Sequence, residues 1–169
     1  DNACNAGTGD ATNIKFCVDA SSNLSLSAGQ KLIVWTGKTF TPGGTVTTAP
    51  ASTAGNIDGD LLIQASATLA MGTNALNVGG DFVNSGTFSE SGTPQVTTFT
   101  ATGTGFTIDN GTGNLDNVVF NGSGGGWSFA DASNTIADDI TMTAGTLSGT
   151  NSLTVNGGDV TGDGTINLT

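Results

Sequence analysis

Acidic side chains are the residues of this chain that could bind a metal ion or move a proton. The chain has 14 of them against three lysines, with no arginine and no histidine. Asp159, Thr161 and Asp163 alternate near the C-terminus, and Gly164 follows them. Oxygen ligands at alternate positions, followed by a glycine for a sharp turn, are typical of a calcium loop. The sequence therefore predicts no cofactor apart from calcium, which Asp159 and Asp163 would bind.

Two observations weaken the calcium interpretation. Residues 159–169 resemble the start of the calcium loop of EF-hands and dockerins, but the carboxylate needed at position 12 falls beyond Thr169. An earlier, similar stretch of the chain, residues 81–88, lacks the pattern. The alternative is that residues 159–163 form one more turn of a structural repeat.

Cleavage of a glycosidic bond is the second chemistry that carboxylates support, and it needs two of them at a fixed separation. Asp138 and Asp139 are the only adjacent acidic residues. Neighbouring residues of a strand point to opposite faces, so this pair does not converge on one substrate. No histidine or arginine is available to support a sugar. We expect no enzyme, and we interpret Asp139 and Asp60 as corner residues.

The charge of the chain excludes several partners. The net charge is −11, and every charged residue after Lys38 is acidic. The three lysines are Lys15, Lys31 and Lys38. Nucleic acids and anionic membrane surfaces need a basic footprint, so both are excluded as partners. No apolar run approaches the length needed to span a bilayer, so we expect no membrane insertion.

Cys4 and Cys17 are the only cysteines. A single pair near the N-terminus of a chain rich in Thr, Asn and Gly predicts a disulfide and an oxidising, extracellular location. Two thiols without histidine make at most half a zinc site. The polar start of the chain lacks a signal peptide, as expected for an exported protein after trimming.

An internal repeat predicts the strands on which these residues lie. Residues 57–88 return, slightly edited, at 136–166, so that Leu69 matches Leu147 at a nearly constant offset. Apolar–polar–apolar triplets begin at equal intervals, at Trp127, Ile140, Leu153 and Ile166. Weaker apolar positions lie between them. Short alternating segments bounded by Gly, Asn, Asp and Ser predict a strand roughly every 6 or 7 residues.

Strands this short fit an antiparallel β-sandwich or a β-solenoid. We favour an all-β parallel solenoid, because the offset divides into four coils of about 19–20 residues, each with three strands. The whole chain would then hold roughly eight coils and form a rod about 40 Å long. The antiparallel β-sandwich is the alternative.

The repeats predict one continuous domain whose two parts differ. Residues 1–56 would form an N-terminal cap and the first coils, and residues 57–169 the regular solenoid. A Pro/Thr/Ala-rich stretch at residues 45–53 is interpreted as a protruding loop. Aromatic residues are expected in the core. The positions that we expect to share that core are Leu69, Leu76, Val78, Phe88, Leu147, Leu153, Val155 and Ile166.

The segments LNVGGDFVNSGTF, LTVNGGDVTGDGTINLT and FTIDNGTGNLDNVVFNGSGG resemble repeats of large bacterial surface proteins. These include autotransporter passengers and adhesins of the filamentous-haemagglutinin type. The resemblance covers about residues 57–169. It implies a right-handed parallel β-helix in an extracellular, non-catalytic element.

We therefore expect a structural or adhesive surface element, such as a filament or coat subunit or a segment of a larger repeat protein. The alternative is a β-helix that binds or processes carbohydrate. The pattern stops at Thr169 without a capping segment, so we expect either a longer chain or head-to-tail self-association. Surface glycans are the other partner considered. Alternating threonines such as Thr98 and Thr100 do not recur regularly enough for an ice-binding face.

Overall fold

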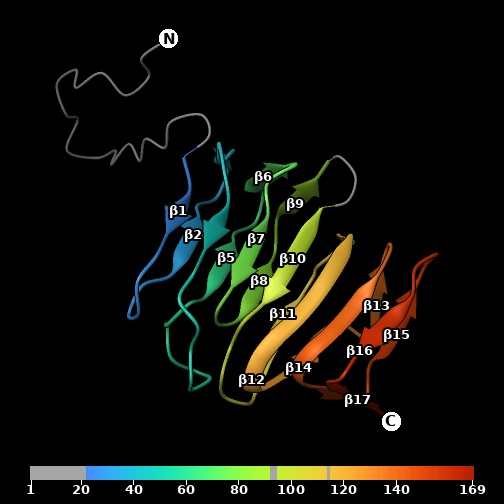
Figure 1. Ribbon diagram of the computed structural model, residues 1–169. Coiled ribbons are helices and arrows are strands. Elements are labelled where there is room, and N and C mark those ends of the chain that lie inside the picture. Colours follow the sequence, from blue (N-terminus) through green and yellow to red (C-terminus); the bar gives the residue numbers. More distant parts are fainter. Residues whose placement is uncertain (1–21, 92–94, 114) are drawn as a thin grey trace, which may run out of the picture.

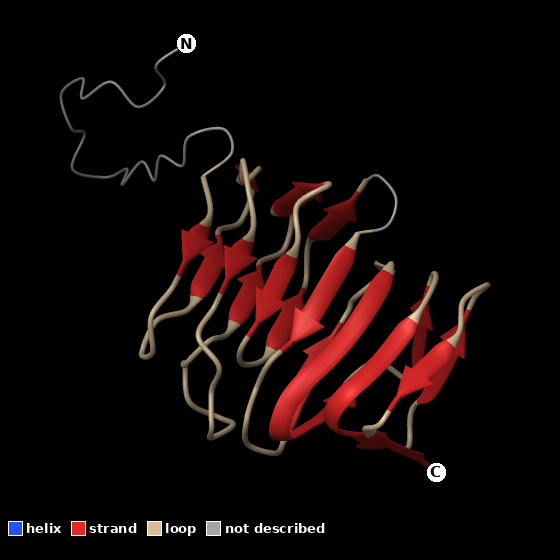
Figure 2. Cartoon of the chain, in the orientation of Figure 1, coloured by secondary structure: helices blue, strands red, loops and turns tan. Residues whose placement is uncertain are grey.

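The computed structural model describes residues 22–91, 95–113 and 115–169. Regular structure in these residues consists of β-strands, without a helix (Figure 2). All the strand pairings are parallel. The chain winds into a β-solenoid of about seven turns, which progresses from the N-terminal to the C-terminal coils (Figure 1). The predicted parallel solenoid is confirmed, and the antiparallel sandwich is excluded.

Each coil contributes strands to three faces. Face 1 contains β1 (Leu24–Ser25), β4 (Val46–Thr47), β7 (Leu76–Val78), β10 (Val96–Phe99), the first parts of β12 (Asn117–Phe129) and β14 (Ile140–Gly149), and β16 (Val160–Gly162). Face 2 contains β2 (Leu32–Val34), β5 (Leu61–Ile63), β8 (Phe82–Asn84), β11 (Phe106–Asp109), the last parts of β12 and β14, and β17 (Thr165–Leu168). Face 3 contains β3 (Thr39–Phe40), β6 (Thr68–Gly72), β9 (Thr87–Glu90), β13 (Ser133–Ile136) and β15 (Ser152–Val155).

The described residues form about seven turns, and the aligned positions of successive coils lie 19 to 30 residues apart. At the start of face 1, 22 residues separate Asn117 from the aligned Asp139, and 20 residues separate Asp139 from Asp159. One coil is much longer, because 30 residues separate Thr47 from its partner Asn77. The extra residues lie in the corners, where length varies without disturbing strand pairing.

The long coil contains a segment, residues 48–60, that packs along the stack. Its Ala51 is buried, with its N–H donating to the Gly79 oxygen (2.7 Å) and its oxygen accepting from the Thr102 N–H (2.8 Å). A Cβ on Gly79 would lie 1.9 Å from the Ala49 oxygen, so this approach requires glycine. The prediction of a protruding loop at residues 45–53 is wrong, because β4 and Ala51 bury much of that stretch.

Matched residues of the two copies of the internal repeat do not lie on the same face. Leu76 lies on face 1, but its predicted counterpart Leu153 lies on face 3. Starting at Leu76, three full turns lead through its aligned face-1 positions to Ile140. Leu153 lies a further two faces along the coil. The offset therefore spans about three and two-thirds turns, and the interpretation as four whole coils is wrong.

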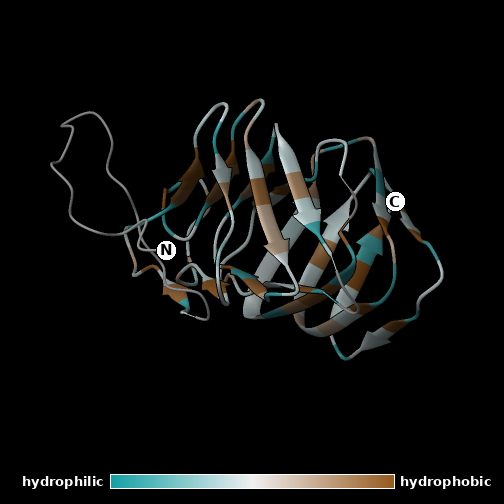
Figure 3. Cartoon of the chain, turned by 90° about the horizontal axis from the view of Figure 1, so that it is seen from above, coloured by the Kyte–Doolittle hydropathy of each residue, from teal (hydrophilic) through white to brown (hydrophobic). Residues whose placement is uncertain are grey.

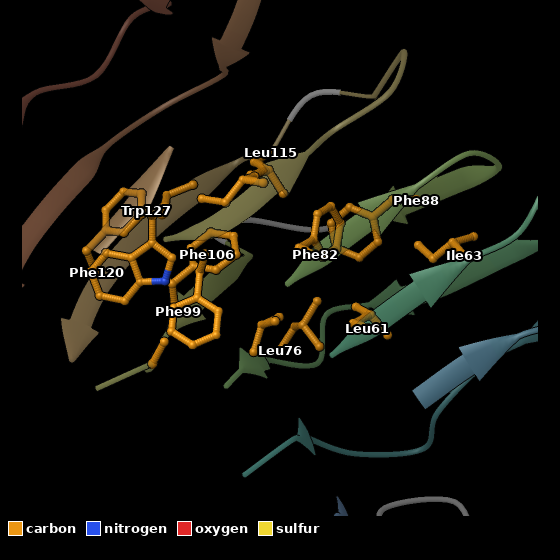
Figure 4. Packing of buried hydrophobic residues seen from close by; sticks show 14 of the residues in the cluster. Leu61, Ile63, Leu76, Phe82, Phe88, Phe99, Phe106, Leu115, Phe120 and Trp127 are labelled. Carbon is orange, nitrogen blue, oxygen red and sulfur yellow. The ribbon is translucent and has the colours of Figure 1, made fainter. Parts of the chain in front are cut away.

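The core is one continuous apolar column inside the coils. Figure 3 shows hydrophobic residues recurring from coil to coil, and Figure 4 shows the aromatic rings packed together. Phe99 stacks on Phe120 with ring centroids 5.3 Å apart, and Phe120 contacts Trp127 at 5.1 Å. The predicted core positions Leu69, Leu76, Val78, Phe88 and Leu147 are buried. Leu153 and Val155 are partly buried against the same cluster.

Ile166 departs from the predicted core, with 37% of its surface exposed. It lies in β17, in the last coil, where no described coil follows to cover it. The predicted Cys4–Cys17 disulfide and Lys15 lie outside the described residues. Within the described residues, no helix is long and apolar enough to cross a membrane.

Candidate functional site

The carboxylates at the corner between faces 1 and 2 bind backbone of the adjoining coil. Asp60 stands directly before β5, and its Oδ1 accepts a hydrogen bond from the Asp81 N–H at 2.9 Å. Asp81 stands at the aligned position before β8, and its Oδ1 accepts from the Thr107 N–H at 2.7 Å. Each carboxylate thus satisfies an amide of the next coil at a corner, where the ladder of the strands is interrupted.

Burial raises the pKa of Asp60 above its ordinary value of 3.8. The neighbouring carboxylates of Asp81 and Asp58 raise it further, while the Asp81 N–H and the Lys31 ammonium oppose the shift. Asp60 is therefore a buried hydrogen-bond acceptor. Its position confirms the prediction that it is a corner residue.

A second series of such contacts follows the corner that precedes face 1. The Asn117 Oδ1 accepts from the Asp139 N–H at 3.2 Å, and the Asp139 Oδ1 accepts from the Asp159 N–H at 2.8 Å. At the other end of the solenoid, the Asn23 Oδ1 accepts from the Thr45 N–H at 2.9 Å. Asp139 is confirmed as a corner residue, although at a different corner from Asp60. We call residues at this position the face-1 corner series.

At the corner between faces 2 and 3, amide side chains form hydrogen bonds with the backbone of the adjoining coil. The Gln64 Oε1 accepts from the Thr36 N–H at 3.0 Å, and the Asn84 Nδ2 donates to the Asn110 oxygen at 3.0 Å. The Asn151 Nδ2 donates to the Phe129 oxygen at 2.7 Å. All three corners are therefore held by polar side chains that bridge successive coils.

Glu90 is a partly buried carboxyl that sequence reasoning missed. It ends β9 and is the only glutamate of the chain. Its Oε1 accepts from the Thr97 hydroxyl at 2.8 Å, and its Oε2 accepts from the Asp116 N–H at 2.9 Å. Burial is the main cause that raises the pKa of Glu90 above 4.5, and the Asp116 carboxylate adds to it. Its uniqueness and its place at a strand end were the available signals.

A carboxyl with a raised pKa is the usual form of a general acid, which makes Glu90 a candidate for that role. Both of its oxygens already accept hydrogen bonds from its own chain. The lysines of the described residues, Lys31 and Lys38, lie in the first coil, two coils before β9. Within the described chain, the surroundings of Glu90 hold β9, β10 and the following coil together, and no lysine acts on its carboxyl.

The predicted calcium ligands Asp159 and Asp163 are both exposed and flank β16. Within residues 22–91, 95–113 and 115–169, no group of three or more acidic, histidine or cysteine side chains could hold a metal ion. The Asp159 N–H is bonded to Asp139 as part of the face-1 corner series. Calcium binding by these two residues stays a prediction, for which the described chain offers no third acidic ligand.

The first coil presents a different surface from the rest of the molecule. A depression of about 540 Å³ opens there, lined mainly by apolar side chains of β1 to β3, with Lys31 and Lys38 beside them. Trp35 lies at this depression with 62% of its surface exposed. The expectation that the aromatics are core residues is wrong for Trp35. Since Leu32 and Val34 face inward on β2, alternation places Trp35 outside.

Four Asn-X-Ser/Thr sequences match the acceptor pattern for glycosylation, and they differ in accessibility: Asn23, Asn110, Asn121 and Asn167. Asn110 is buried, and its Nδ2 donates to the Gly113 oxygen. The other three are exposed. Glycan attachment at Asn110 would therefore require local opening, whereas the other three side chains are accessible.

Comparison of the chain with protein-family models, with curated proteins and with solved structures finds no match. Function therefore has to be inferred from the arrangement of the residues alone.

Proposed function

We propose that this chain is a non-catalytic structural or adhesive element of an extracellular surface protein. It would act as a rod segment, within a filament or coat or within a larger repeat protein. One observation carries the proposal: the polar side chains that could do chemistry bind the backbone of neighbouring coils. Asp60, Asp81 and Asp139 each accept an amide N–H from the next coil, and Glu90 accepts two hydrogen bonds.

The aromatic residues support the same role. Proteins that bind sugars present aromatic faces to solvent, because sugar rings stack on them. Here Phe82, Phe99, Phe106, Phe120 and Trp127 are fully buried. A rod uses these rings as packing volume, which suits a narrow core that must exclude water over its whole length.

Within surface proteins, we further propose kinship with autotransporter passengers and filamentous-haemagglutinin-type adhesins. The support is the likeness of residues 57–169 to their repeats, together with the parallel solenoid that the chain forms. An extracellular location agrees with the single pair of cysteines, Cys4 and Cys17, and with the acidic composition.

Carbohydrate binding is the second candidate, and Trp35 is the observation that favours it. An exposed indole beside two lysines is suited to stacking on an acidic sugar. Against it, the other large exposed apolar residues of the described chain are aliphatic: Ile57, Val160 and Ile166. A single aromatic gives a weak platform for a sugar chain.

A binding and cleavage screen tests the proposal. The full chain would be titrated with neutral and uronate-containing oligosaccharides while tryptophan fluorescence is recorded, and the products would be assayed for new reducing ends. We expect neither saturable quenching nor cleavage. Saturable quenching that disappears in Trp35→Ala and persists in Ile57→Ala would support the carbohydrate alternative. Cleavage that is lost in Glu90→Gln would contradict a non-catalytic role.

A further inference from the structure

The last coil exposes apolar positions that every inner coil buries. Val160 aligns with Ile140 on face 1, and Ile166 aligns with Leu147 on face 2. Ile140 and Leu147 are fully buried, whereas Val160 and Ile166 are 53% and 37% exposed. A further coil of the same kind would cover both side chains, since each coil is covered by the next.

The first coil offers the matching surface. β1, β2 and β3 each pair with one other described strand, and the depression beside them is lined by Leu24, Leu26, Leu32, Val34 and Phe40 among others. At the other end, β16, β17 and β15 also each have one described partner. Each end therefore presents one strand from each of the three faces.

We propose that the last coil of one molecule docks on the first coil of a second copy. This contact rests on the proposed structural role and names its partner. β16 would pair with β1 and β17 with β2 of the second copy, in the parallel sense used throughout the solenoid. On face 3, one strand position stays open between β15 and β3, because β15 precedes β16 along the chain and β3 follows β2. The ladders of faces 1 and 2 then continue across the junction without a change of face.

The face-1 corner series supports this register. Each member, from Asn117 through Asp139, accepts the N–H of the residue at the same position in the next coil. Asp159 is the last member, and Asn23 of the first coil occupies the same position before β1. In the docked pair, the Asp159 carboxylate would accept the Asn23 N–H of the second copy.

Charge complementarity supports the head-to-tail sense. The described lysines, Lys31 and Lys38, both lie in the first coil beside the apolar depression. The stretch from Asp138 to Thr169 contains four aspartates and no lysine or arginine. Docking of like ends would bring charges of the same sign together, whereas head-to-tail docking brings opposite charges together. A contact between unlike ends does not close, so it propagates into a filament.

Sedimentation velocity on the full chain over a range of concentrations tests the contact. We expect the average mass to rise without limit as the concentration rises. Val160→Asp should weaken association about tenfold or more, because it places an unpaired carboxylate in the junction. The control is Ser85→Asp, since Ser85 is exposed but lies between β8 and β9, in an inner coil. It should associate like the wild type.

Mixing two variants tests the polarity. Val160→Asp disables the C-terminal end, and the double variant Lys31→Glu with Lys38→Glu disables the N-terminal end. At concentrations where the wild type just begins to associate, each alone should stay monomeric, and their mixture should form a 1:1 dimer through the two intact ends. A dimer formed by either variant alone would overturn head-to-tail docking.

Two other results would overturn the proposal. One is a wild-type chain that stays monomeric at the highest attainable concentration. That result would mean that another part of the chain, or a bound small molecule, covers the first coil. The other is association that responds to the lysine changes but not to Val160→Asp. In both cases, absence of sugar binding and cleavage would leave the proposed structural role standing.

Discussion

The two halves of the solenoid form the corner between faces 1 and 2 in different ways. In the N-terminal half, faces 1 and 2 are separate short strands, and the 48–60 segment packs over the corner between them. In the C-terminal half, β12 and β14 run from face 1 to face 2 as single bent strands (Figure 1). On face 1, the separation of aligned positions varies from 21 to 30 residues in the N-terminal half, but only from 20 to 22 residues between Asn117 and Asp159.

The difference shows that stacking depends on the aligned inward positions and on the corner hydrogen bonds, and not on a fixed coil length. Both halves place buried apolar residues in the same columns. An insertion is tolerated where its polar backbone finds partners in neighbouring coils, as Ala51 does between Gly79 and Thr102.

The largest expected effect is a difference in the free energy of unfolding between a substitution in an inner coil and one in the end coil. Phe120→Ala removes a ring packed between Phe99 and Trp127, so we expect the free energy of unfolding to fall by about 3–5 kcal/mol. Ile166→Ala, in the last coil, should cost less than about 1 kcal/mol, because its side chain is partly exposed. Urea unfolding of both variants checks this. Equal losses would show that the end coil is covered in solution.

The next largest loss of stability is expected from substitution of a glycine in the bent strand β14. Gly145 has a φ of +92°, and a Cβ there would lie 2.6 Å from Trp127 Cζ3. Gly145→Ala should therefore destabilise the protein by about 2–4 kcal/mol. Gly37→Ala is the control, since its φ is +69° but a Cβ would meet nothing within 4 Å. Its cost should be about 1 kcal/mol. Similar melting temperatures for the two variants would mean that the C-terminal corner is not tightly packed.

Thr48→Val tests whether the 48–60 segment belongs to the stack. The buried Thr48 hydroxyl donates to the Gly59 oxygen and accepts from the Gly79 N–H. Removing it should cost about 1–3 kcal/mol, because the Gly79 N–H loses its partner and the Gly59 oxygen keeps only the Gly80 N–H. Hydrogen exchange should quicken in β4, β5 and β7 and stay unchanged in β14, since coils interact mainly with their neighbours. Uniform quickening would show that the two halves unfold as one unit.

The smallest effect is the pH dependence contributed by Glu90. Its pKa is raised by folding, so the folded state binds this proton more tightly than the unfolded state does. The contribution of Glu90 to the free energy of unfolding therefore falls as the pH rises from 4.5 through the folded pKa. Glu90→Gln removes this fall, and its Oε1 can still accept the Asp116 N–H.

Urea unfolding of Glu90→Gln and wild type at a series of pH values from 4.5 upward measures the effect. The stability of the variant relative to the wild type should increase with pH. The raised pKa of Asp60 acts in both proteins and cancels in the comparison. A difference that does not vary with pH would mean that the Glu90 carboxyl is as exposed in the folded protein as in the unfolded chain.

The sequence predicted the parts of this fold that repeat. Alternating triplets such as Ile140-Thr141-Met142 predicted short strands, and the parallel solenoid followed from their spacing. Assignment to faces was wrong, because inward positions look alike on all three faces: Leu76 and Leu153 share neighbours in sequence but not a face. The corner lengths were not predicted, because they are set by contacts such as that of Ala51, which no local pattern reveals.

The sequence predicted that polar residues lie at the corners, but it did not predict their hydrogen-bond partners. Asp60 and Asp139 were expected at corners, where they lie. Their acceptor role depends on amides one coil further along the chain, so it becomes visible only when the coil length is known. Glu90 was missed for the same reason, since Asp116 lies 26 positions along the chain.

The central claim is that the corner carboxylates act as hydrogen-bond acceptors between coils and not as charges for a metal ion or a reaction. Paired substitutions at Asp81 test it most directly, because Asp81 Oδ1 accepts the Thr107 N–H. Asp81→Ala should lower the free energy of unfolding by about 1–3 kcal/mol. Asp81→Asn keeps an acceptor oxygen and should stay within about 0.5 kcal/mol of the wild type. Equal, large losses in both variants, measured by urea unfolding, would show that the negative charge itself is needed and would contradict this account.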